Sequence, residues 1–344
     1  MQITAELLEN KVIIKKPKDV GRLYNKSHIG KIISGNNLEL DLLEAVFLLG
    51  EGKILIFKNK KKIDFEKLTK IAAKKISEFE VKYHAFKDLR NRGHAIKLYD
   101  KEKNINFYNF NQTFFLSSYS ERDLLEIDEA TKLVKKIEKK NKEFWLGILD
   151  EEGDLTYYNM SILDIKGKNK EHSYEKTKSI LLKDRVVIFD KKASEKLHEK
   201  EFFGKPFGEG LQLSIVEAIY LQEKNVIEIY SVDDKRITKE DLLKLVKDQQ
   251  PDIILRYYVF KDLKKRGLLV KTGFKFGAHF RAYSKKPGDT HAEYLVHVVS
   301  KGFKSTWAEI SRAVRLAHSV NKEIAFAKVD KTKIDYIKFG RLRP

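Results

Sequence analysis

Apolar and polar residues alternate in blocks along the chain, and the most regular series of blocks begins near residue 274. Residues 274–283 and 294–300 are two apolar, aromatic-rich runs, and the loop 284–289 between them contains Pro and Gly beside Asp. This pattern is typical of two strands joined by an exposed basic loop. From Thr306 onward, apolar residues recur at helical spacing over about four turns, and the Glu three residues later completes a capping box. A short apolar strand, residues 324–329, follows the helix.

The chain also carries an internal duplication. Residues 81–93 match residues 255–267 at an offset of 174 positions, and both segments contain Phe-Lys-Asp-Leu and end in Arg-Gly. At nearly the same offset, three further pairs of segments agree: 12–14 with 186–188, 30–31 with 204–205, and 42–48 with 215–221. Two copies are too few for a solenoid, so we predict a tandem duplication of one two-part unit.

The pattern predicts the same elements in both copies. Each copy is expected to begin with a strand and a Gly-containing turn, followed by a helix, a short strand and a pair of helices closed by Gly93 or Gly267. The expected ranges are 11–14 and 185–189 for the first strand, 38–49 and 211–221 for the helix, and 53–57 and 226–230 for the second strand.

The predicted fold class is α/β (α+β). Each copy would have a small N-terminal α/β subdomain and a C-terminal mixed-sheet subdomain, and a polar linker, residues 166–178, would join the copies. We expect the four subdomains to span residues 1–95, 96–167, 168–268 and 269–344.

Composition narrows the class of partner. The 344 residues include 69 Lys and Arg against 50 Asp and Glu, and the formal net charge of +19 favours a polyanion, nucleic acid above all. A solvating lysine coat of the thermophile kind is the alternative. There is no cysteine, which excludes disulfides and thiolate metal sites. No run approaches about 18 apolar residues, and the first ten residues show no signal pattern, so we expect a cytoplasmic protein with no membrane span.

Three side chains near the C-terminal end form a candidate acid–base set. The predicted strand, loop, strand, helix and strand bring Tyr283, His291 and Lys322 to three neighbouring element ends. An imidazole exchanges protons near neutral pH, and an ammonium stabilises a developing oxyanion and favours the anionic form of a nearby phenol. Such a set suits attack by an RNA 2′-hydroxyl on its own phosphodiester, without Mg²⁺. The alternative is ordinary structure: a strand-end Tyr, a solvated His and a surface Lys.

These residues carry a family resemblance. Residues 273–283, 291–300 and 315–330 resemble the C-terminal catalytic domain of the archaeal tRNA-splicing endonucleases, and Tyr283 and His291 with Lys322 fall on that family's catalytic Tyr, His and Lys. The resemblance implies cleavage of precursor tRNA at bulge–helix–bulge intron junctions without metal or other cofactor. The products would be a 2′,3′-cyclic phosphate and a 5′-hydroxyl. It also implies the homodimeric form of the family, in which two duplicated chains give two active sites.

The first copy is predicted to be inactive. Lys142 aligns with the candidate lysine of copy two, but at the same offset of 180 positions Asn111 and Lys103 stand in the places of the His and the Tyr. Copy one instead has an acidic loop between expected strands 144–149 and 155–160. A plain hairpin turn is one interpretation; the resemblance implies docking into another subunit. The acidic residues are Asp150, Glu151, Glu152 and Asp154.

Further basic residues surround the candidate site. The resemblance implies two arginines that clamp a bulge base; Arg315 has a compatible spacing before the lysine, and Arg341 is the nearest Arg for the second place. General phosphate contacts are the alternative for both. Lys285 and Lys286 in the predicted loop are also expected to bind RNA.

Two other functions are compatible with parts of the sequence. A non-enzymatic RNA-binding or scaffold protein would use the charge and the repeat but not the three candidate residues. A Mg²⁺-dependent nuclease would use Asp252 after Pro251 together with Asp262 and Lys264. Asp262 and Lys264 are expected in a helix end, and copy one repeats Lys-Asp-Leu without Pro-Asp, which favours a structural role. His291 and His297 are six residues apart on one expected strand and could share a face, but His297 is expected to be packed rather than to bind a metal.

Overall fold

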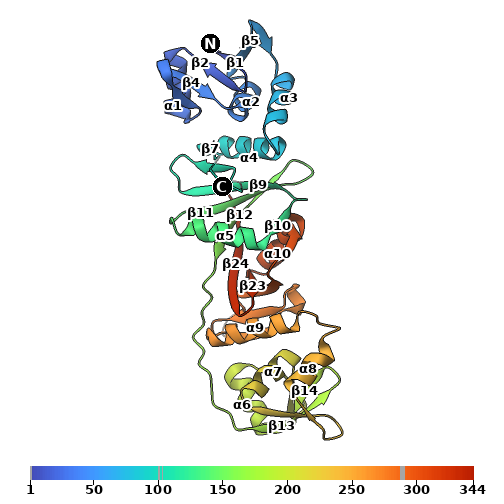
Figure 1. The fold of residues 1–344 in the computed structure, drawn as a ribbon. Helices are drawn as coiled ribbons and strands as arrows, with labels where there is room; N and C mark the ends of the chain where they lie inside the picture. Colours follow the sequence, from blue (N-terminus) through green and yellow to red (C-terminus); the bar gives the residue numbers. More distant parts are fainter. Residues whose placement is uncertain (1, 100, 103, 287–290) are drawn as a thin grey trace. The chain divides into compact units, whose positions relative to one another are not determined.

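The computed structural model describes residues 2–99, 101–102, 104–286 and 291–344. The chain divides into two compact units, and Figure 1 labels their helices and strands. Unit 1 consists of Met1–Leu124, Val134–Met160 and Arg341–Pro344, and unit 2 of Leu125–Leu133 and Ser161–Gly340. Within the described part of the chain, no helix has both the length and the apolar character of a membrane span.

Unit 1 begins with a six-stranded sheet and four helices. The strand order is β3-β4-β2-β1-β5-β6, with β1 parallel to β5 and antiparallel to β2. The strands are β1 (Ile3–Leu8), β2 (Lys11–Ile14), β3 (Lys31–Ile33), β4 (Asn37–Leu40), β5 (Ile54–Lys58) and β6 (Lys61–Ile63). The helices are α1 (Pro17–Ser27), α2 (Leu42–Gly50), α3 (Phe65–Lys75) and α4 (Phe79–Asn91).

Five strands of a second, larger sheet complete unit 1. They follow the order β7-β8-β9-β11-β12, and α4 packs against β9 and β11. The strands are β7 (Ile96–Leu98), β8 (Phe107–Asn109), β9 (Phe114–Ser120), β11 (Glu143–Leu149) and β12 (Leu155–Ile162). Buried Phe86 on α4 contacts Phe107 on β8, so one apolar core joins the two halves of this unit.

Unit 2 repeats this architecture. Its first sheet has the order β15-β16-β14-β13-β17-β18, and its second sheet contains β19-β20-β21-β23-β24. The first half comprises β13 (Thr177–Leu182), β14 (Arg185–Ile188), α6 (Lys191–Glu201), β15 (Lys205–Phe207), β16 (Gly210–Leu213), α7 (Ile215–Glu223), β17 (Ile227–Tyr230), β18 (Arg236–Ile237), α8 (Lys239–Val246) and α9 (Ile253–Lys265). The second half comprises β19 (Leu269–Thr272), β20 (Phe280–Tyr283), β21 (Tyr294–Ser300), β22 (Lys304–Thr306), α10 (Trp307–Ser319), β23 (Glu323–Asp330) and β24 (Lys333–Leu342). The matching strand orders confirm the predicted tandem duplication.

A short segment from the middle of the chain belongs to unit 2. It contains most of β10 (Leu124–Glu126), which pairs with β22, and the start of α5 (Ile127–Glu138). The amide of Ile127 donates a hydrogen bond of 3.1 Å to the Phe303 carbonyl, and Asp128 accepts one of 3.0 Å from the Gly302 amide. Sequence patterns did not indicate that this segment belongs to unit 2, because no local signal marks a distant strand partner.

The first strand of each copy was missed. β1 and β13 precede the strands predicted to come first, and each pairs antiparallel with that predicted strand. The side chains of β1 alternate between buried and partly or fully exposed, with polar Thr4 and Glu6 interrupting the apolar positions. Such a half-buried strand lacks the continuous apolar run that makes β2 recognisable.

The predicted helices 38–49 and 211–221 begin four residues too early. Residues 38–40 and 211–213 lie in the strands β4 and β16, and the helices start after Asp41 and Ser214. Both residues are N-caps in complete capping boxes with the Glu three residues later. The polar cap therefore decides where each strand ends and the helix begins.

The predicted strand 274–283 forms only at its end. Residues Phe274–Phe276 make a 3-10 turn, and β20 starts at Phe280. Gly277 adopts φ +64°, a left-handed conformation that favours glycine, so the chain turns here between β19 and β20. The helix predicted after Thr306 is confirmed as α10. The Thr306 hydroxyl accepts a hydrogen bond of 3.3 Å from the Glu309 amide, but the Glu309 carboxylate binds Ser305 instead, so only half of the capping box forms.

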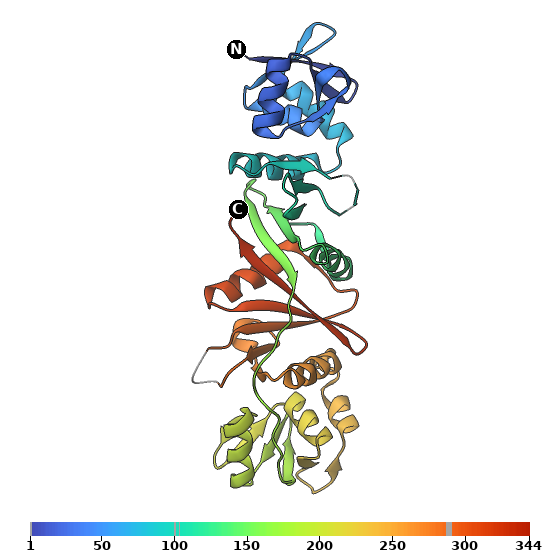
Figure 2. The same ribbon diagram turned by 90° about the vertical axis from the view of Figure 1, so that its left-hand side faces the viewer.

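The segment between the copies contains no helix or strand from residue 163 to residue 176. Figure 2 shows it as an extended green segment that leads from β12 to β13. It is held by hydrogen bonds within unit 2: the amides of Gly167 and Asn169 donate to the carbonyls of Arg266 and Gly267, at 2.9 and 3.0 Å.

Candidate active site

Three neighbouring strands of unit 2 position Tyr283 and Lys322. Ala282 of β20 pairs with Tyr294 of β21, which in turn pairs with Glu323 of β23. Tyr283 follows Ala282, and Lys322 precedes Glu323, so both residues lie at the same ends of the strands. Their backbones are two strand spacings apart, roughly 10 Å.

The end of α10 fixes Lys322. After the helix, Asn321 adopts φ +54°, and this turn aims the chain into β23. The Lys322 amide donates a hydrogen bond of 3.0 Å to the Ala317 carbonyl, and its Nζ donates one of 3.0 Å to the Val320 carbonyl. Both the backbone and the ammonium of this lysine are therefore held by the last turn of the helix.

Tyr283 is packed rather than exposed. Only 6% of it is accessible, and it forms a small apolar cluster with Leu269 and Ala292, against which Phe202 also packs. Lys286 lies above this cluster, with its Nζ 5.7 Å from the centre of the Phe202 ring. The packing restricts the phenol to one region of the site.

One cation, Arg281, and one aromatic ring, Phe276, connect Lys322 with Tyr283. The Lys322 Nζ lies 5.2 Å from the centre of the Phe276 ring, and the Arg281 guanidinium carbon lies 6.0 Å from the same ring. Arg281 in turn lies 5.9 Å from the centre of the Tyr283 ring. Sequence reasoning missed Arg281 and Phe276. The i, i+2 spacing of Arg281 and Tyr283 on one strand was the available signal, because alternate side chains share a face.

His291 is exposed and lies three residues before β21. The predicted turn residues Pro287, Gly288 and Asp289 lie outside the described residues. Glu293 holds the two sides of this connection together: its carboxylate accepts hydrogen bonds from the Ser284 amide, at 3.2 Å, and the Ser284 hydroxyl. Its amide donates to the Ala282 carbonyl at 3.2 Å. This carboxylate clamp was also missed, since an isolated Glu gives no pattern.

The strand register identifies the corresponding residues of the first copy. The Thr113 carbonyl accepts a hydrogen bond from the Glu143 amide, and in copy two the Glu293 carbonyl accepts the equivalent bond from the Glu323 amide. Thr113 therefore corresponds to Glu293, and two residues earlier Asn111 corresponds to His291, as predicted. Phe107 has the same place in its pairing with β9 as Phe280 has in its pairing with β21. Three residues further along each chain segment, Phe110 therefore corresponds to Tyr283.

The predicted counterpart of Tyr283 was therefore wrong. Lys103 lies outside the described residues, and the register assigns the place to Phe110, which has no hydroxyl. The alignment failed because three residues separate Phe110 from Phe114, whereas ten separate Tyr283 from Tyr294. A single offset cannot cross a connection whose length differs between the copies.

The other predicted RNA-binding residues are exposed. Lys285 follows β20, Arg315 lies on α10, and Arg341 lies near the end of β24. Arg315 belongs to unit 2 and Arg341 to unit 1.

The acidic loop is a compact turn between β11 and β12. The Asp150 carboxylate accepts hydrogen bonds from the amides of Glu152 and Asp154, at 3.0 and 2.9 Å, so this residue shapes the loop. Glu151, Glu152 and Asp154 are exposed, and Glu151 is paired with Arg122 of the same unit.

The residues of the alternative Mg²⁺ site are engaged separately. Asp252 binds Arg256 at 2.8 Å, Asp262 binds Arg266 at 2.6 Å, and Lys264 has a different carboxylate partner. Within the described ranges, no three His, Asp or Glu side chains are grouped as metal ligands would be. Two carboxylates and a lysine that each serve another contact do not form a metal site.

A histidine pair borders a basic cavity in unit 2. The cavity, about 950 Å³, lies beside β19 and β20, and Arg281, Lys271 and His279 are part of its lining. Burial is the main cause that lowers the pKa of His279 to about 4, and it also lowers the pKa of His297. His297 is a packed residue of β21, 4.7 Å from His279 between ring centres, as expected. Both imidazoles are therefore neutral at neutral pH.

Comparison with protein families gives two matching models. Residues 253–336 match the model of the tRNA intron endonuclease, catalytic C-terminal domain. The model of the tRNA intron endonuclease, N-terminal domain, matches twice, at residues 3–69 and 177–243.

Several archaeal proteins are similar over the whole chain. A tRNA-splicing endonuclease of Methanococcoides burtonii is 36% identical over 98% of this chain and 99% of its own length. One from Methanosarcina barkeri is 32% identical over 96% of this chain and 97% of its own length. A tRNA-splicing endonuclease of Methanothermobacter thermautotrophicus is 37% identical, but 94% of its length covers only 46% of this chain.

Proposed function

The chain belongs to the tRNA intron endonuclease family, and from this premise we propose that it cuts precursor tRNA at bulge–helix–bulge intron junctions without a metal ion. It is an RNA-cleaving enzyme, and its full-length relatives are named tRNA-splicing endonucleases. The observation that best supports the proposed chemistry is the placement of Tyr283 and Lys322 at the same end of the sheet, on β20 and beside β23 with only β21 between them, and with Arg281 against the phenol.

In this proposal the nucleophile is the 2′-hydroxyl before the scissile phosphate. Tyr283 removes its proton as general base, and the 2′-oxygen attacks phosphorus while the bond from phosphorus to the 5′-oxygen breaks. His291 gives a proton to the departing 5′-oxygen as general acid. Lys322 stabilises the charge that develops on the phosphoryl oxygens. The products are a 2′,3′-cyclic phosphate and a 5′-hydroxyl, and no water is consumed in the step.

The local charges support the role of the cation. Arg281 and Lys322 both lie near the Phe276 ring, so two positive groups flank the side of the site where the Tyr283 phenol is held. Positive charge stabilises the phosphoryl oxygens in the transition state and also attracts the substrate phosphate. Neither effect requires a metal ion.

The proposal includes a homodimer. The exposed Glu151, Glu152 and Asp154 of the inactive copy would enter a basic pocket of the second subunit, and Asp150 would hold the loop in shape. The relative from Methanothermobacter, whose whole length matches about half of this chain, supports one family unit per copy. The four subdomains at 1–95, 96–167, 168–268 and 269–344 belong to this proposal.

RNA recognition would rest on exposed cations around the site. Arg315 and Arg341 would stack on a bulge base, and Lys285 and Lys286 would bind phosphates. Contacts of this kind read the shape and the backbone of the RNA, which suits a duplex whose base edges lie in a deep, narrow groove.

The first test is cleavage of a labelled bulge–helix–bulge RNA in EDTA. A second RNA with 2′-deoxy sugars at the two scissile positions is the matched control. We expect the all-ribose RNA to be cut with cyclic-phosphate ends and the deoxy RNA to stay intact. Cutting that appears only after addition of Mg²⁺, or cutting of the deoxy RNA, would contradict the mechanism.

A further inference from the structure

Unit 1 contains a basic groove that the proposed chemistry does not use. The groove has a volume of about 560 Å³ and is bordered by α1, the end of α4 and the start of β5. Arg22, Lys26, Lys53 and Arg90 line it, together with His28 and His94. Among the described residues, no Asp or Glu lines it, and none of these four cations forms an ion pair.

Arg90 is the most deeply placed of these cations. Its Nη2 donates a hydrogen bond to the carbonyl of Ser27, the last residue of α1. Its Nη1 is buried without a hydrogen-bond partner in the described part of the chain. Burial lowers the pKa of the Arg90 guanidinium, which remains charged because the ordinary value is 12.5. A buried donor with no acceptor is costly and marks a place for an external oxygen.

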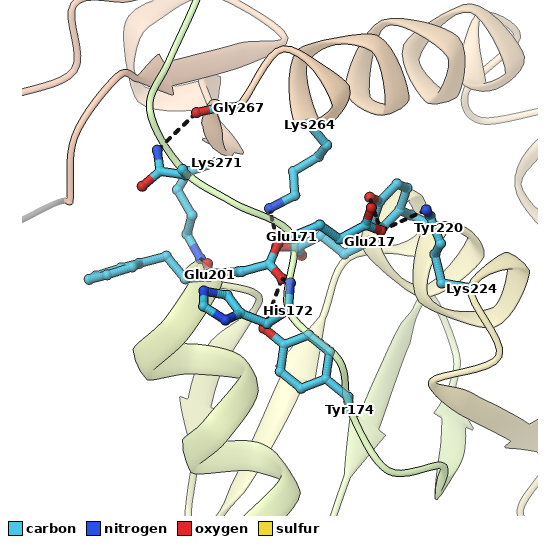
Figure 3. A network of polar contacts seen from close by, with 12 residues as sticks. Glu171, His172, Tyr174, Glu201, Glu217, Tyr220, Lys224, Lys264, Gly267 and Lys271 are labelled. Atoms are coloured by element: carbon cyan, nitrogen blue, oxygen red, sulfur yellow. Dashed lines mark hydrogen bonds and ion pairs between the residues drawn. The ribbon is translucent and has the colours of Figure 1, made fainter.

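The second copy satisfies the same position internally. α1 and α6 each have 11 residues and end at Ser27 and Glu201, and α4 and α9 each have 13 residues with Arg90 and Lys264 next to last. Lys264 and Glu201 form an ion pair of 2.7 Å, with 5% and 4% of their side chains accessible. Figure 3 shows this pair at the centre of a polar network. Copy two has a carboxylate where copy one has only a hydroxymethyl group.

Copy two also fills its own groove. The segment before β13 lies across it: the amide of His172 and the hydroxyl of Tyr174 donate to Glu201, at 3.0 and 2.9 Å (Figure 3). Glu171 of the same segment pairs with Lys224 at 2.6 Å. In unit 1 the lining of the corresponding groove contains no Asp or Glu, and Glu44, which lies outside the lining, acts on Arg90 through its charge.

We propose that the groove of unit 1 binds backbone phosphates of the substrate RNA. The guanidinium of Arg90 would donate its free N–H to a phosphate oxygen, in place of the carboxylate that Lys264 has in copy two. The first copy, which lacks the Tyr and His of the active copy, would thus hold RNA rather than cut it. This proposal rests on the proposed function for the identity of the RNA.

A polyanion fits the groove better than a peptide does. Arg22 and Lys26 lie four residues apart on α1, where like charges repel each other unless an anion lies between them. Several cations without counter-charges match the repeated phosphates of a nucleic-acid strand. Two of the hydrogen bonds that hold the peptide segment in the groove of copy two end on Glu201, which copy one does not have.

The test gives copy one the carboxylate of copy two. Ser27→Glu would pair with Arg90 inside the protein, and Ser27→Gln has nearly the same shape without the charge. The probe is a fluorescent precursor tRNA with 2′-deoxy sugars at the scissile positions, measured by anisotropy at several salt concentrations. We expect Ser27→Glu to bind about 3- to 10-fold more weakly than Ser27→Gln, and the slope of log K against log salt to fall by about 1. The melting temperature of Ser27→Glu should be no lower than that of Ser27→Gln.

The surface variants Lys26→Glu and Lys26→Gln repeat the comparison without touching a buried group. Equal RNA affinity within both pairs would overturn the proposal, and a groove that serves a peptide would give that result. Cleavage of the all-ribose RNA by the unchanged protein is measured in parallel. If the protein binds but does not cut, the proposed function fails while the comparison of the variants still reports on the groove.

Discussion

At the scale of single residues, His291 carries the sharpest prediction. In the proposed mechanism His291 is the general acid for the departure of the 5′-oxygen, and its exposed position gives it little part in packing. We expect His291→Ala to slow cleavage by about 10²–10⁴-fold while RNA affinity is retained. Single-turnover cleavage and anisotropy measure the two quantities.

The control for this prediction is His318→Ala, which removes another exposed imidazole, on α10. It should cleave at the unchanged rate. Free imidazole added to His291→Ala should restore part of the rate, since it supplies the missing acid. Full activity of His291→Ala without imidazole would remove His291 from the mechanism.

At the scale of elements, two acidic side chains at the start of α2, Asp41 and Glu44, repel each other when both are ionised. Burial raises the pKa of Asp41 to about 6 and that of Glu44 to about 8, and the charge of Asp41 adds to the effect on Glu44. Glu44 accepts a hydrogen bond of 2.9 Å from the Gly30 amide. Copy two has Ser214 in the place of Asp41, with the same capping box. The acidic pair is therefore a feature of copy one alone.

The pair predicts a pH dependence of stability. The ordinary pKa values are 3.8 and 4.5, so the folded state binds these protons more tightly than the unfolded chain does. Their contribution to stability is fully present below about pH 4 and is lost as the pH rises to about 8. We expect Asp41→Ser, which keeps an N-cap, to stabilise unit 1 by roughly 2 kcal/mol at pH 8 and hardly at all at pH 4. Urea unfolding at the two pH values measures this, and an equal effect at both would contradict it.

The elements also show what the sequence made predictable. Strand β2, helix α10 and the hairpin of β11 and β12 followed from apolar runs, a capping residue and turn chemistry, all of which act locally. The contacts around Tyr283 did not. Arg281 and Tyr283 share β20, but Lys322 reaches the Phe276 ring only because β20, β21 and β23 pair in the sheet. The family resemblance named the candidate residues, but the strand register was needed to find Phe110 in the first copy.

At the scale of the whole molecule, the acidic loop predicts how copies of the chain assemble. We expect Glu151→Lys with Glu152→Lys to convert a dimer to a monomer, because both side chains are exposed and would place positive charge in a basic pocket. Light scattering after size-exclusion chromatography measures the mass. Lys331→Glu with Thr332→Glu alters the matching turn of copy two and should leave the mass unchanged. A monomeric starting protein, or a double-lysine variant that remains dimeric, would contradict the proposal.

Leu125–Leu133 belong to unit 2, and this affects how the chain folds during its synthesis. The first copy emerges from the ribosome before the residues that pair with this segment have been synthesised, because Phe303 and Gly302 come about 175 residues later. Synthesis proceeds at about 5–20 residues per second. For roughly 9 to 35 seconds the nascent first copy therefore carries an unpaired strand edge. A gene cut between the two repeats would leave that edge permanently exposed. The duplicated sequence looks divisible into halves, but its folding is not.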